Sequence, residues 1–164
     1  MPTMIFSKIE SYEDIVKKLD KKEDKIAIIS CNTCARTCGN GGINKLNELG
    51  FRLIREGYNV TDEAVVLYAC SEPILRESKL NIDDANTIIV LSCSAGWSCF
   101  TRSYPDKKVL KVTEDIGLVI TDTDREIFKV VMPYKGYESE LGNEYRTNTG
   151  EPLTSKKIKL RCVA

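Results

Sequence analysis

The amino-acid sequence predicts an α/β protein built on an open, three-layer, mainly parallel sheet of the Rossmann-like or flavodoxin-like type, with a C-terminal β-hairpin extension. Three short apolar runs lead to this prediction: "KIAIIS" at 25–30, "AVVLYA" at 64–69 and "TIIVLS" at 87–92. Continuous apolar runs of this length are typical of parallel strands that are covered on both faces. The stretches between them are long enough for the helix that each parallel connection needs.

Helical patterns precede and separate these three runs. Ser11 is a plausible N-cap for a first helix, whose apolar face is formed by Ile9, Tyr12, Ile15, Val16 and Leu19. A second helix is expected from Gly41 to about Tyr58, with Gly57 at its stop. Pro73 falls in the first turn of "EPILRESKL" (72–80) and so marks the start of a third helix.

The pattern changes after residue 105. "KKVLKV" (107–112) is a candidate fourth strand of the same sheet. "IGLVI" and "EIFKVVM" flank the polar stretch "TDTDR" (121–125), which predicts a hairpin with a solvated turn. We therefore expect one α/β domain over residues 1–135, which includes the hairpin and the cysteine site described below. Residues 136–164 are expected to be a polar, extended or loosely ordered extension.

Charge and hydropathy limit the partners of the chain. Lysine plus arginine equals aspartate plus glutamate, 24 each, so there is no basic field for nucleic acid. No apolar stretch approaches the length of a membrane span, and the N-terminus does not have the pattern of a secretory signal. We expect a cytoplasmic protein without membrane insertion, in which thiols stay reduced. The oligomeric state is left open by the sequence.

The chain has 7 cysteines and 0 histidines. In a reducing compartment so many cysteines need an explanation other than disulfides. The lack of histidine excludes Cys–His dyads and histidine metal sites. A site for a soft metal would have to be built from thiolates, with carboxylates as possible helpers.

Five of the cysteines fall where predicted strands end. Cys31 follows the first apolar run, and Cys34 and Cys38 lie in the loop that leaves it. Cys70 follows the second run and Cys93 follows the third. The carboxyl ends of parallel strands meet at one edge of a sheet, where ligands of open α/β proteins bind. We therefore expect these five thiols to lie close together.

The spacing of these cysteines favours an iron–sulfur cluster. Cys31, Cys34 and Cys38 form a C-x2-C-x3-C triplet, and with one distant cysteine they fit the four thiolates of a [4Fe–4S] cluster. A four-cysteine zinc site usually has two C-x2-C pairs, and only one occurs here, so Zn²⁺ is the alternative. A thiol-based redox enzyme is a third possibility, with thiolate activation by a helix N-terminus or a lysine. No residue is assigned a catalytic role.

The fourth ligand is open between Cys93 and Cys70. Gly96 lets backbone approach an inorganic group near Cys93, whereas Glu72 and Pro73 make the surroundings of Cys70 less suitable, so Cys93 is favoured. The same reasoning makes three glycines candidates for cofactor binding, because helix N-terminal amides stabilise an anionic centre: Gly39, Gly41 and Gly42. Cys99 and Cys162 are expected to be ordinary, inert thiols.

Three segments resemble one known family. "CNTCARTCGNGG" (31–42), "CSEP" (70–73) and "IIVLSCSAG" (88–96) are similar to the small cysteine-rich subunit of acetogen-type methylenetetrahydrofolate reductase, also found as the methylenetetrahydrofolate reductase C-terminal domain. The resemblance spans roughly residues 8–105. The matching positions are Cys31, Cys34, Cys38, Gly41, Gly42, Cys70, Glu72, Pro73, Cys93 and Gly96.

The resemblance implies a metal-binding, electron-transfer subunit that passes electrons toward a flavin-containing or other oxidoreductase subunit. Two departures stand out. Ser71 is inserted in the second segment, and the cysteine-rich tail of the fuller subunits is reduced here to Cys162. The sequence contains no recognisable flavin or folate site, so the chain is expected to be an accessory subunit rather than a folate reductase by itself.

Overall fold

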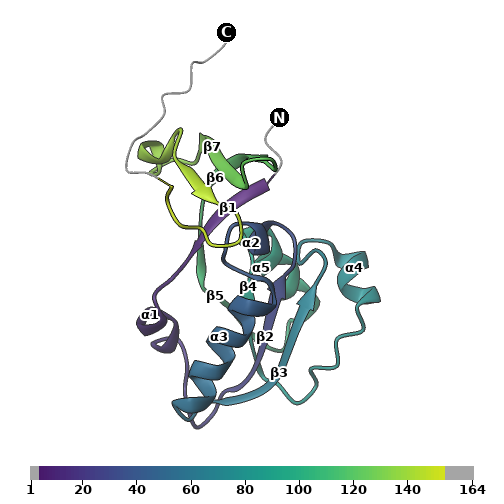
Figure 1. Cartoon of the computed structure of the whole chain (residues 1–164). Helices are drawn as coiled ribbons and strands as arrows, with labels where there is room; N and C mark the ends of the chain where they lie inside the picture. The colour runs from purple at the N-terminus through teal and green to yellow at the C-terminus, as the bar shows by residue number, and fades with distance from the viewer. Residues whose placement is uncertain (1–3, 154–164) are drawn as a thin grey trace.

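A computed structural model of the chain describes residues 4–153 and contains two four-stranded sheets. The first is parallel, with strand order β3-β2-β4-β5. The second is antiparallel, with order β1-β6-β7-β8. In Figure 1 the antiparallel sheet lies above the ends of the parallel strands, with α2 between the two. The chain is therefore α/β, as predicted, but with two sheets instead of one sheet and an appended hairpin.

The apolar runs form the centre of the parallel sheet. β2 (Lys25–Cys31) and β4 (Thr87–Leu91) are its two inner strands and are almost completely buried. β5 (Lys108–Lys111) pairs in parallel with β4 and confirms the expected fourth strand. Ile26, Ile28, Ile89 and Leu91 pack toward α1 (Tyr12–Val16) and α3 (Gly42–Arg55). The other face packs against α4 (Glu72–Glu77) and α5 (Ser94–Ser103), so helices cover both faces.

The second apolar run does not form the strand that was expected. β3 spans Asn59–Val66, so it begins five positions before the predicted start at 64 and ends before Leu67. It is an edge strand and only its last residue is fully buried, which explains why its polar first half carries no apolar signal. Consequently Cys70 does not directly follow the strand but lies in the loop between β3 and α4.

The hairpin is the centre of a larger sheet. β6 (Thr113–Asp122) and β7 (Ile127–Pro133) form the predicted hairpin. The sequence did not predict the flanking strands, which are β1 (Met4–Ile9) beside β6 and β8 (Glu144–Arg146) beside β7. The expectation of a loosely ordered extension after residue 135 is therefore wrong for this part, because η1 (Glu138–Glu140) and β8 belong to the second sheet. Residues 154–164 lie outside the described residues.

An aromatic cluster fills the core of the antiparallel sheet. Phe6, Phe128 and Tyr145 come from β1, β7 and β8, and their ring centroids lie 4.8–5.3 Å apart. Ile116, Val119 and Val130 complete this core. Each aromatic residue comes from a different strand, so the cluster joins the N-terminal strand to the C-terminal part of the described chain.

Local signals define most helix ends. The Ser11 hydroxyl accepts a hydrogen bond from the amide of Asp14 at 3.2 Å, so it caps α1 as predicted. α3 ends just before Gly57, whose φ of 90° lies in the left-handed region that favours glycine. Ser71 caps α4, which gives the inserted serine a structural role. The short α2 (Cys34–Thr37) and α5 were not predicted, and Ile9 belongs to β1 and not to the first helix.

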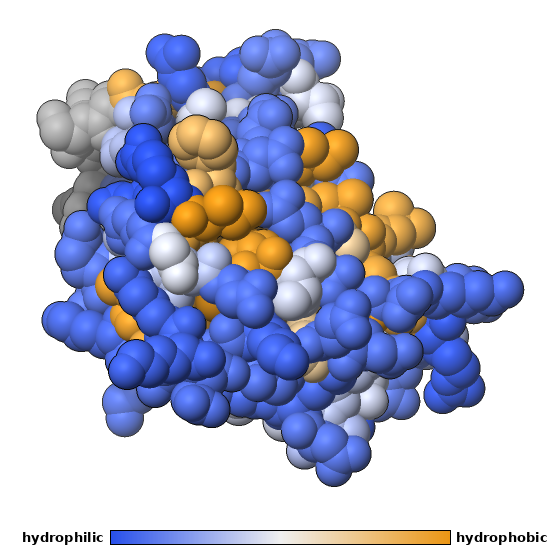
Figure 2. All heavy atoms as spheres, turned by 90° about the horizontal axis from the view of Figure 1, so that it is seen from below, coloured by the Kyte–Doolittle hydropathy of each residue, from blue (hydrophilic) through white to orange (hydrophobic). Residues whose placement is uncertain are grey.

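Most of the surface seen from below is hydrophilic, with apolar side chains gathered in a few places (Figure 2). Over residues 4–153, no helix combines the length and the apolar character that a membrane crossing requires. The large apolar side chains that are exposed in the described chain are Ile43, Phe51, Ile54, Leu67, Tyr68, Met132 and Tyr134.

Candidate metal centre

The thiols lie at the carboxyl ends of the two inner parallel strands. Cys31 is the last residue of β2, Cys34 opens α2 and Cys38 directly follows α2. Cys93 is the N-cap residue of α5, just beyond β4. Strands β3 and β4 lie on opposite sides of β2, so these thiols stand where the strand order reverses. Cys70, on the β3 side, is exposed to solvent.

Cys34 is close to three other thiols. Burial raises the pKa of its thiol, and a backbone hydrogen bond from Ile5 lowers it. The negative charges of Cys31, Cys93 and Cys70 raise it further, which requires these sulfurs to lie near Cys34. Thiols from three separate segments of the chain thus lie toward this edge of the sheet.

Cys38 is the most deeply buried member of the group. Burial raises the pKa of its thiol far above the usual value, and the charges of Cys34 and Cys93 raise it further. It packs against the core of the antiparallel sheet, whereas Cys31 packs against the core of the parallel sheet. The thiol group therefore stands at the junction of the two sheets.

Cys93 lies next to the N-terminal amides of α5. Burial raises the pKa of its thiol, while backbone hydrogen bonds from Gly96 and Ala95 lower it. These amides favour the thiolate, as expected for a residue at the start of a helix. Asp115 and Cys70 raise the pKa of Cys93 through their charges, so Cys70 also belongs to this neighbourhood.

The antiparallel sheet covers the thiol group with polar residues that sequence reasoning missed. The Asp115 carboxylate of β6 accepts hydrogen bonds from the amide of Ser94 at 3.1 and 3.2 Å and so caps α5 from the other sheet. Burial raises the pKa of Tyr134, and the charges of Asp115 and Cys93 raise it further. Asp115 and Tyr134 therefore both lie beside Cys93.

The loop that carries the thiols is also joined to the edge of β1. The side chain of Asn40 accepts a hydrogen bond from the amide of Ile9 at 3.1 Å and donates one to the carbonyl of Ser7. Asn40 is buried, and it satisfies backbone groups of an edge strand that β6 does not reach. The position of the thiol loop therefore depends on β1.

One buried polar atom near the thiols has no partner. The Ser7 hydroxyl is fully buried and makes no hydrogen bond within residues 4–153. Ser7 lies directly opposite Asp115 in the β1–β6 pair, so the two side chains share the face of the sheet that carries the cap of α5. Buried hydroxyl groups nearly always have a partner. An unpartnered hydroxyl on this face fits a site that receives a polar or inorganic group.

The thiols are neighbours without being gathered around one point. Within the described part of the chain, no three His, Cys, Asp or Glu side chains form a group that could hold a metal ion. A single zinc ion would need its sulfurs at about 2.3 Å from its centre, and so close to one another.

The four glycines assigned to the cofactor have packing roles. The missing side chain of Gly39 leaves room for the backbone of Thr149 and Gly150, and that of Gly42 leaves room for the stem of Arg36. Gly41 packs against Ser30 and Ala35, and Gly96 against Ser92 and Ala69. Their role toward a cofactor stays a prediction, because these contacts already explain why glycine is needed.

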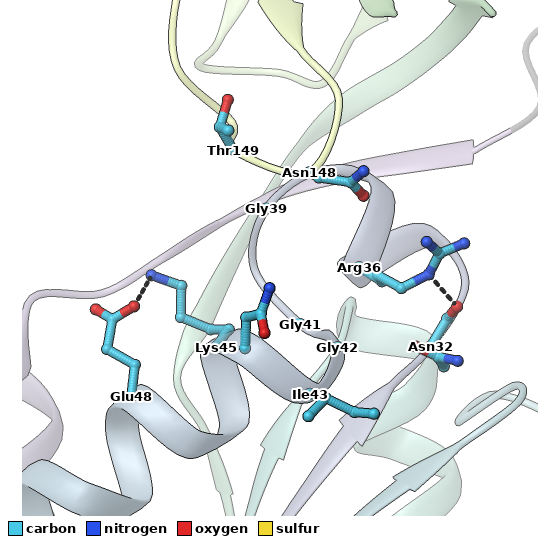
Figure 3. A pocket seen from close by; sticks show the side chains of 11 residues that line it. Asn32, Arg36, Gly39, Gly41, Gly42, Ile43, Lys45, Glu48, Asn148 and Thr149 are labelled. Atoms are coloured by element: carbon cyan, nitrogen blue, oxygen red, sulfur yellow. Dashed lines mark hydrogen bonds and ion pairs between the residues drawn. The ribbon is translucent and has the colours of Figure 1, made fainter.

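A cavity of about 640 Å³ lies beside the thiols at the start of α3 (Figure 3). Gly39, Gly41 and Gly42 line it together with Arg36 and Lys45, and no cysteine does. The Lys45 ammonium pairs with Glu48 at 3.4 Å, and the Arg36 guanidinium donates to the carbonyl of Asn32 at 3.0 Å. The glycine-rich segment therefore faces this cavity as well as the thiol loop.

Cys99 is fully buried in the core that α5 shares with the parallel sheet. Burial raises the pKa of its thiol, which disfavours the thiolate and agrees with the prediction of an inert thiol. Cys162 lies outside the described residues.

Three comparisons, with protein-family models, with curated proteins and with solved structures, find no match for this chain. No family membership follows, and the function has to be inferred from the residues of the chain and their arrangement.

Proposed function

We propose that the chain is an iron–sulfur electron-transfer protein, an accessory subunit of a flavin- or folate-type oxidoreductase. The [4Fe–4S] cluster would be held by Cys31, Cys34, Cys38 and Cys93, with Cys70 beside it. The observation that carries the proposal is the placement of Cys31, Cys34 and Cys38 at the end of β2 and of Cys93 just beyond the neighbouring β4, at the same edge of the parallel sheet.

The arrangement favours Cys93 over Cys70 as the fourth ligand. Cys93 neighbours both Cys34 and Cys38, is partly buried and receives backbone hydrogen bonds from the start of α5. Hydrogen bonds to ligand sulfurs are one of the means by which proteins tune a cluster. Cys70 is exposed, which suits a position between the cluster and solvent.

The surroundings of the thiols fit an iron–sulfur group. Thiolates that raise one another's pKa are stabilised by a bound cation, since a coordinating thiol is deprotonated. Such a cluster supplies one-electron oxidation and reduction when it is bound. Cys31, Cys34, Cys38 and Cys93 would hold it, and the amides of Ala95 and Gly96 would donate to the Cys93 sulfur. The unpartnered Ser7 hydroxyl is a further donor for this group.

The strand order and the family resemblance support the proposed fold type and the proposed partner. The strand order β3-β2-β4-β5 corresponds to the flavodoxin-like order, in which ligands bind at the switch point. The resemblance of residues 8–105 to the methylenetetrahydrofolate reductase subunit supports a flavin-containing or other oxidoreductase subunit as partner. Zinc binding and thiol chemistry are the competing outcomes of the test.

Metal analysis of anaerobically purified protein tests the proposal. We expect about four iron and four sulfide per chain, a brown colour and a paramagnetic signal after reduction. One zinc per chain without iron, or metal-free protein with five reactive thiols, would contradict it.

Serine substitutions test the ligand set. Cys34→Ser, Cys38→Ser and Cys31→Ser should abolish or degrade the chromophore, and Cys93→Ser should lose or strongly shift the signal of the reduced protein. Cys70→Ser should change that signal only mildly. Cys99→Ser is the matched control, because Cys99 lies six positions from Cys93 but in the apolar core. An unaltered signal in Cys93→Ser with a lost signal in Cys70→Ser would reverse the assignment.

A further inference from the structure

A basic groove of about 430 Å³ lies between α4 and the end of α5. Arg76, Lys79 and Arg102 line it, against the single carboxylate of Glu72. Leu75, Leu80, Ser103 and Tyr104 form the rest of its lining. Arg102 pairs with Glu72, whereas Arg76 and Lys79 form no ion pair within residues 4–153, so two cations of the groove have no paired carboxylate.

The groove begins where the thiol group reaches solvent. Glu72 stands two positions after the exposed Cys70 and pairs with Arg102, Nε to Oε1, at 3.2 Å. Burial raises the pKa of Cys99, and the charges of Glu72, Arg102 and Cys70 all act on it as well. Cys70 and the Glu72–Arg102 pair therefore both lie near Cys99, so this end of the groove borders the exposed side of the thiol site.

Lys79 occupies a backbone conformation that favours glycine. Its φ of 47° lies in the left-handed region, directly after the C-cap residue of α4. A residue with a side chain is strained there, whereas glycine is not. Lys79 also lines the groove.

Apolar side chains lie on the other side of Cys70. Leu67 and Tyr68 are exposed, and the carbonyl of Leu67 accepts a hydrogen bond from the Thr33 hydroxyl at 2.5 Å. They thus sit against the thiol loop. An apolar margin on one side and cations on the other are typical of a surface that binds a protein.

We propose that this surface, Leu67 and Tyr68 with the groove of Arg76, Lys79 and Arg102, docks an electron-carrier protein with acidic residues around its cofactor. The proposal rests on the proposed electron-transfer function, and the positive charge of the groove selects an acidic partner. Opposite charges speed up the encounter and orient the partner. Docking beside Cys70 brings the cofactor of the partner to the side where the thiol site is exposed.

Binding to two redox proteins of opposite charge tests this surface. The probes are a plant-type [2Fe–2S] ferredoxin, which is acidic, and a basic cytochrome c, titrated calorimetrically into the purified full chain. We expect the ferredoxin to bind, and its affinity to fall at least about tenfold when salt is raised from about 20 to about 200 mM, because the attraction is screened. Cytochrome c should bind more weakly at both salt concentrations.

Three variants locate the binding. Arg76→Glu with Lys79→Glu should weaken ferredoxin binding by about tenfold or more. Lys79→Gly should weaken it by about threefold while the melting temperature stays equal or rises, because glycine relieves the backbone strain. Lys22→Glu is the control for a charge reversal elsewhere on the surface, since the exposed Lys22 lies at the opposite end of the parallel strands, and should bind like the unaltered protein.

Iron analysis of the same samples separates the two proposals. An iron-loaded chain that does not bind ferredoxin, or binds it equally well after the double reversal, overturns the docking surface alone. Tighter binding of cytochrome c overturns it too. A chain without iron overturns the proposed function, whatever it binds.

Discussion

The two sheets contribute differently to the candidate site. The parallel sheet supplies the thiols, which lie at or just beyond the ends of its inner strands. The antiparallel sheet supplies no thiol, but it covers the thiols with Asp115, Tyr134 and the edge of β1. The positions of the cysteines can therefore be read locally in the sequence, whereas the cover comes from contacts between distant parts of the chain.

Contacts between the sheets should make them one folding unit. Asn40 ties the thiol loop to β1, and Asp115 ties β6 to α5. Both links pass beside the thiol group. A substitution that destabilises the antiparallel sheet should therefore also destabilise the parallel sheet.

Phe6→Ala should have the largest effect on the antiparallel sheet. Phe6 is 1% exposed and packs against Phe128 and Tyr145. Its loss should lower the free energy of unfolding by about 3–5 kcal/mol. Urea denaturation followed by circular dichroism measures this, and Phe51→Ala, at a position that is 67% exposed, should change it by less than about 0.5 kcal/mol.

The single tryptophan extends this experiment to the other sheet. Trp97 lies in α5, and its indole donates to the carbonyl of Val109 at 3.0 Å, so its fluorescence reports on the parallel half. If the sheets fold together, Phe6→Ala moves the fluorescence and circular dichroism midpoints equally. A fluorescence midpoint that stays in place would show that the two sheets unfold independently.

Asn40→Ala should come next. The change leaves the amide of Ile9 and the carbonyl of Ser7 without their side-chain partner in a buried place. We expect a loss of about 2 kcal/mol in the free energy of unfolding, because unsatisfied buried groups are costly. Asn44→Ala, at an exposed position of α3, is the control and should be nearly neutral. Equal stability of both variants would contradict the role of Asn40 as the link to β1.

The sequence predicted the parallel half because its signals are local. The runs of β2 and β4 are apolar throughout, and both strands are covered on both faces. Cys31 and Cys93 could be placed because they stand next to these runs. The same logic failed for β3, where an edge strand contains polar residues such as Asp62 and Glu63.

The antiparallel half could be predicted only in part, because its edge strands depend on long-range pairing. The hairpin of β6 and β7 is local and was predicted. β1 is short, and its pairing partner β6 lies more than a hundred positions away, so no neighbouring pattern marks it. Asp115 lies in β6 and caps α5, a role that appears only when the two sheets meet. The cover of the site was therefore beyond sequence reasoning, while the position of the cysteines at the strand ends was not.

Asp115→Ala should have a smaller effect on the free energy of unfolding, because it removes a contact between the two sheets. Its carboxylate caps α5 through the amide of Ser94. Removing the cap should lower the free energy of unfolding by about 1 kcal/mol. The neighbouring Glu114→Ala is the control, since Glu114 is exposed and bonds only the Tyr137 hydroxyl. If Glu114→Ala proves as harmful as Asp115→Ala, the cap does not contribute to stability.

Ser7→Ala should have the smallest effect on the free energy of unfolding. Whether the change stabilises or destabilises the protein shows whether the Ser7 hydroxyl has a protein partner. In metal-free protein the buried Ser7 hydroxyl has no partner within the described residues, so its removal should leave the free energy of unfolding unchanged or raise it by up to about 0.5 kcal/mol. Ser92→Ala is the matched control. The Ser92 hydroxyl is also buried but donates to the carbonyl of Cys93 at 2.9 Å, so its loss should lower stability by about 1 kcal/mol.

In iron-loaded protein, Ser7→Ala should change the reduction potential, because a hydroxyl donor beside the cluster is lost. A destabilised metal-free variant together with an unchanged potential would show that Ser7 has a protein partner and does not face the group that the thiols bind.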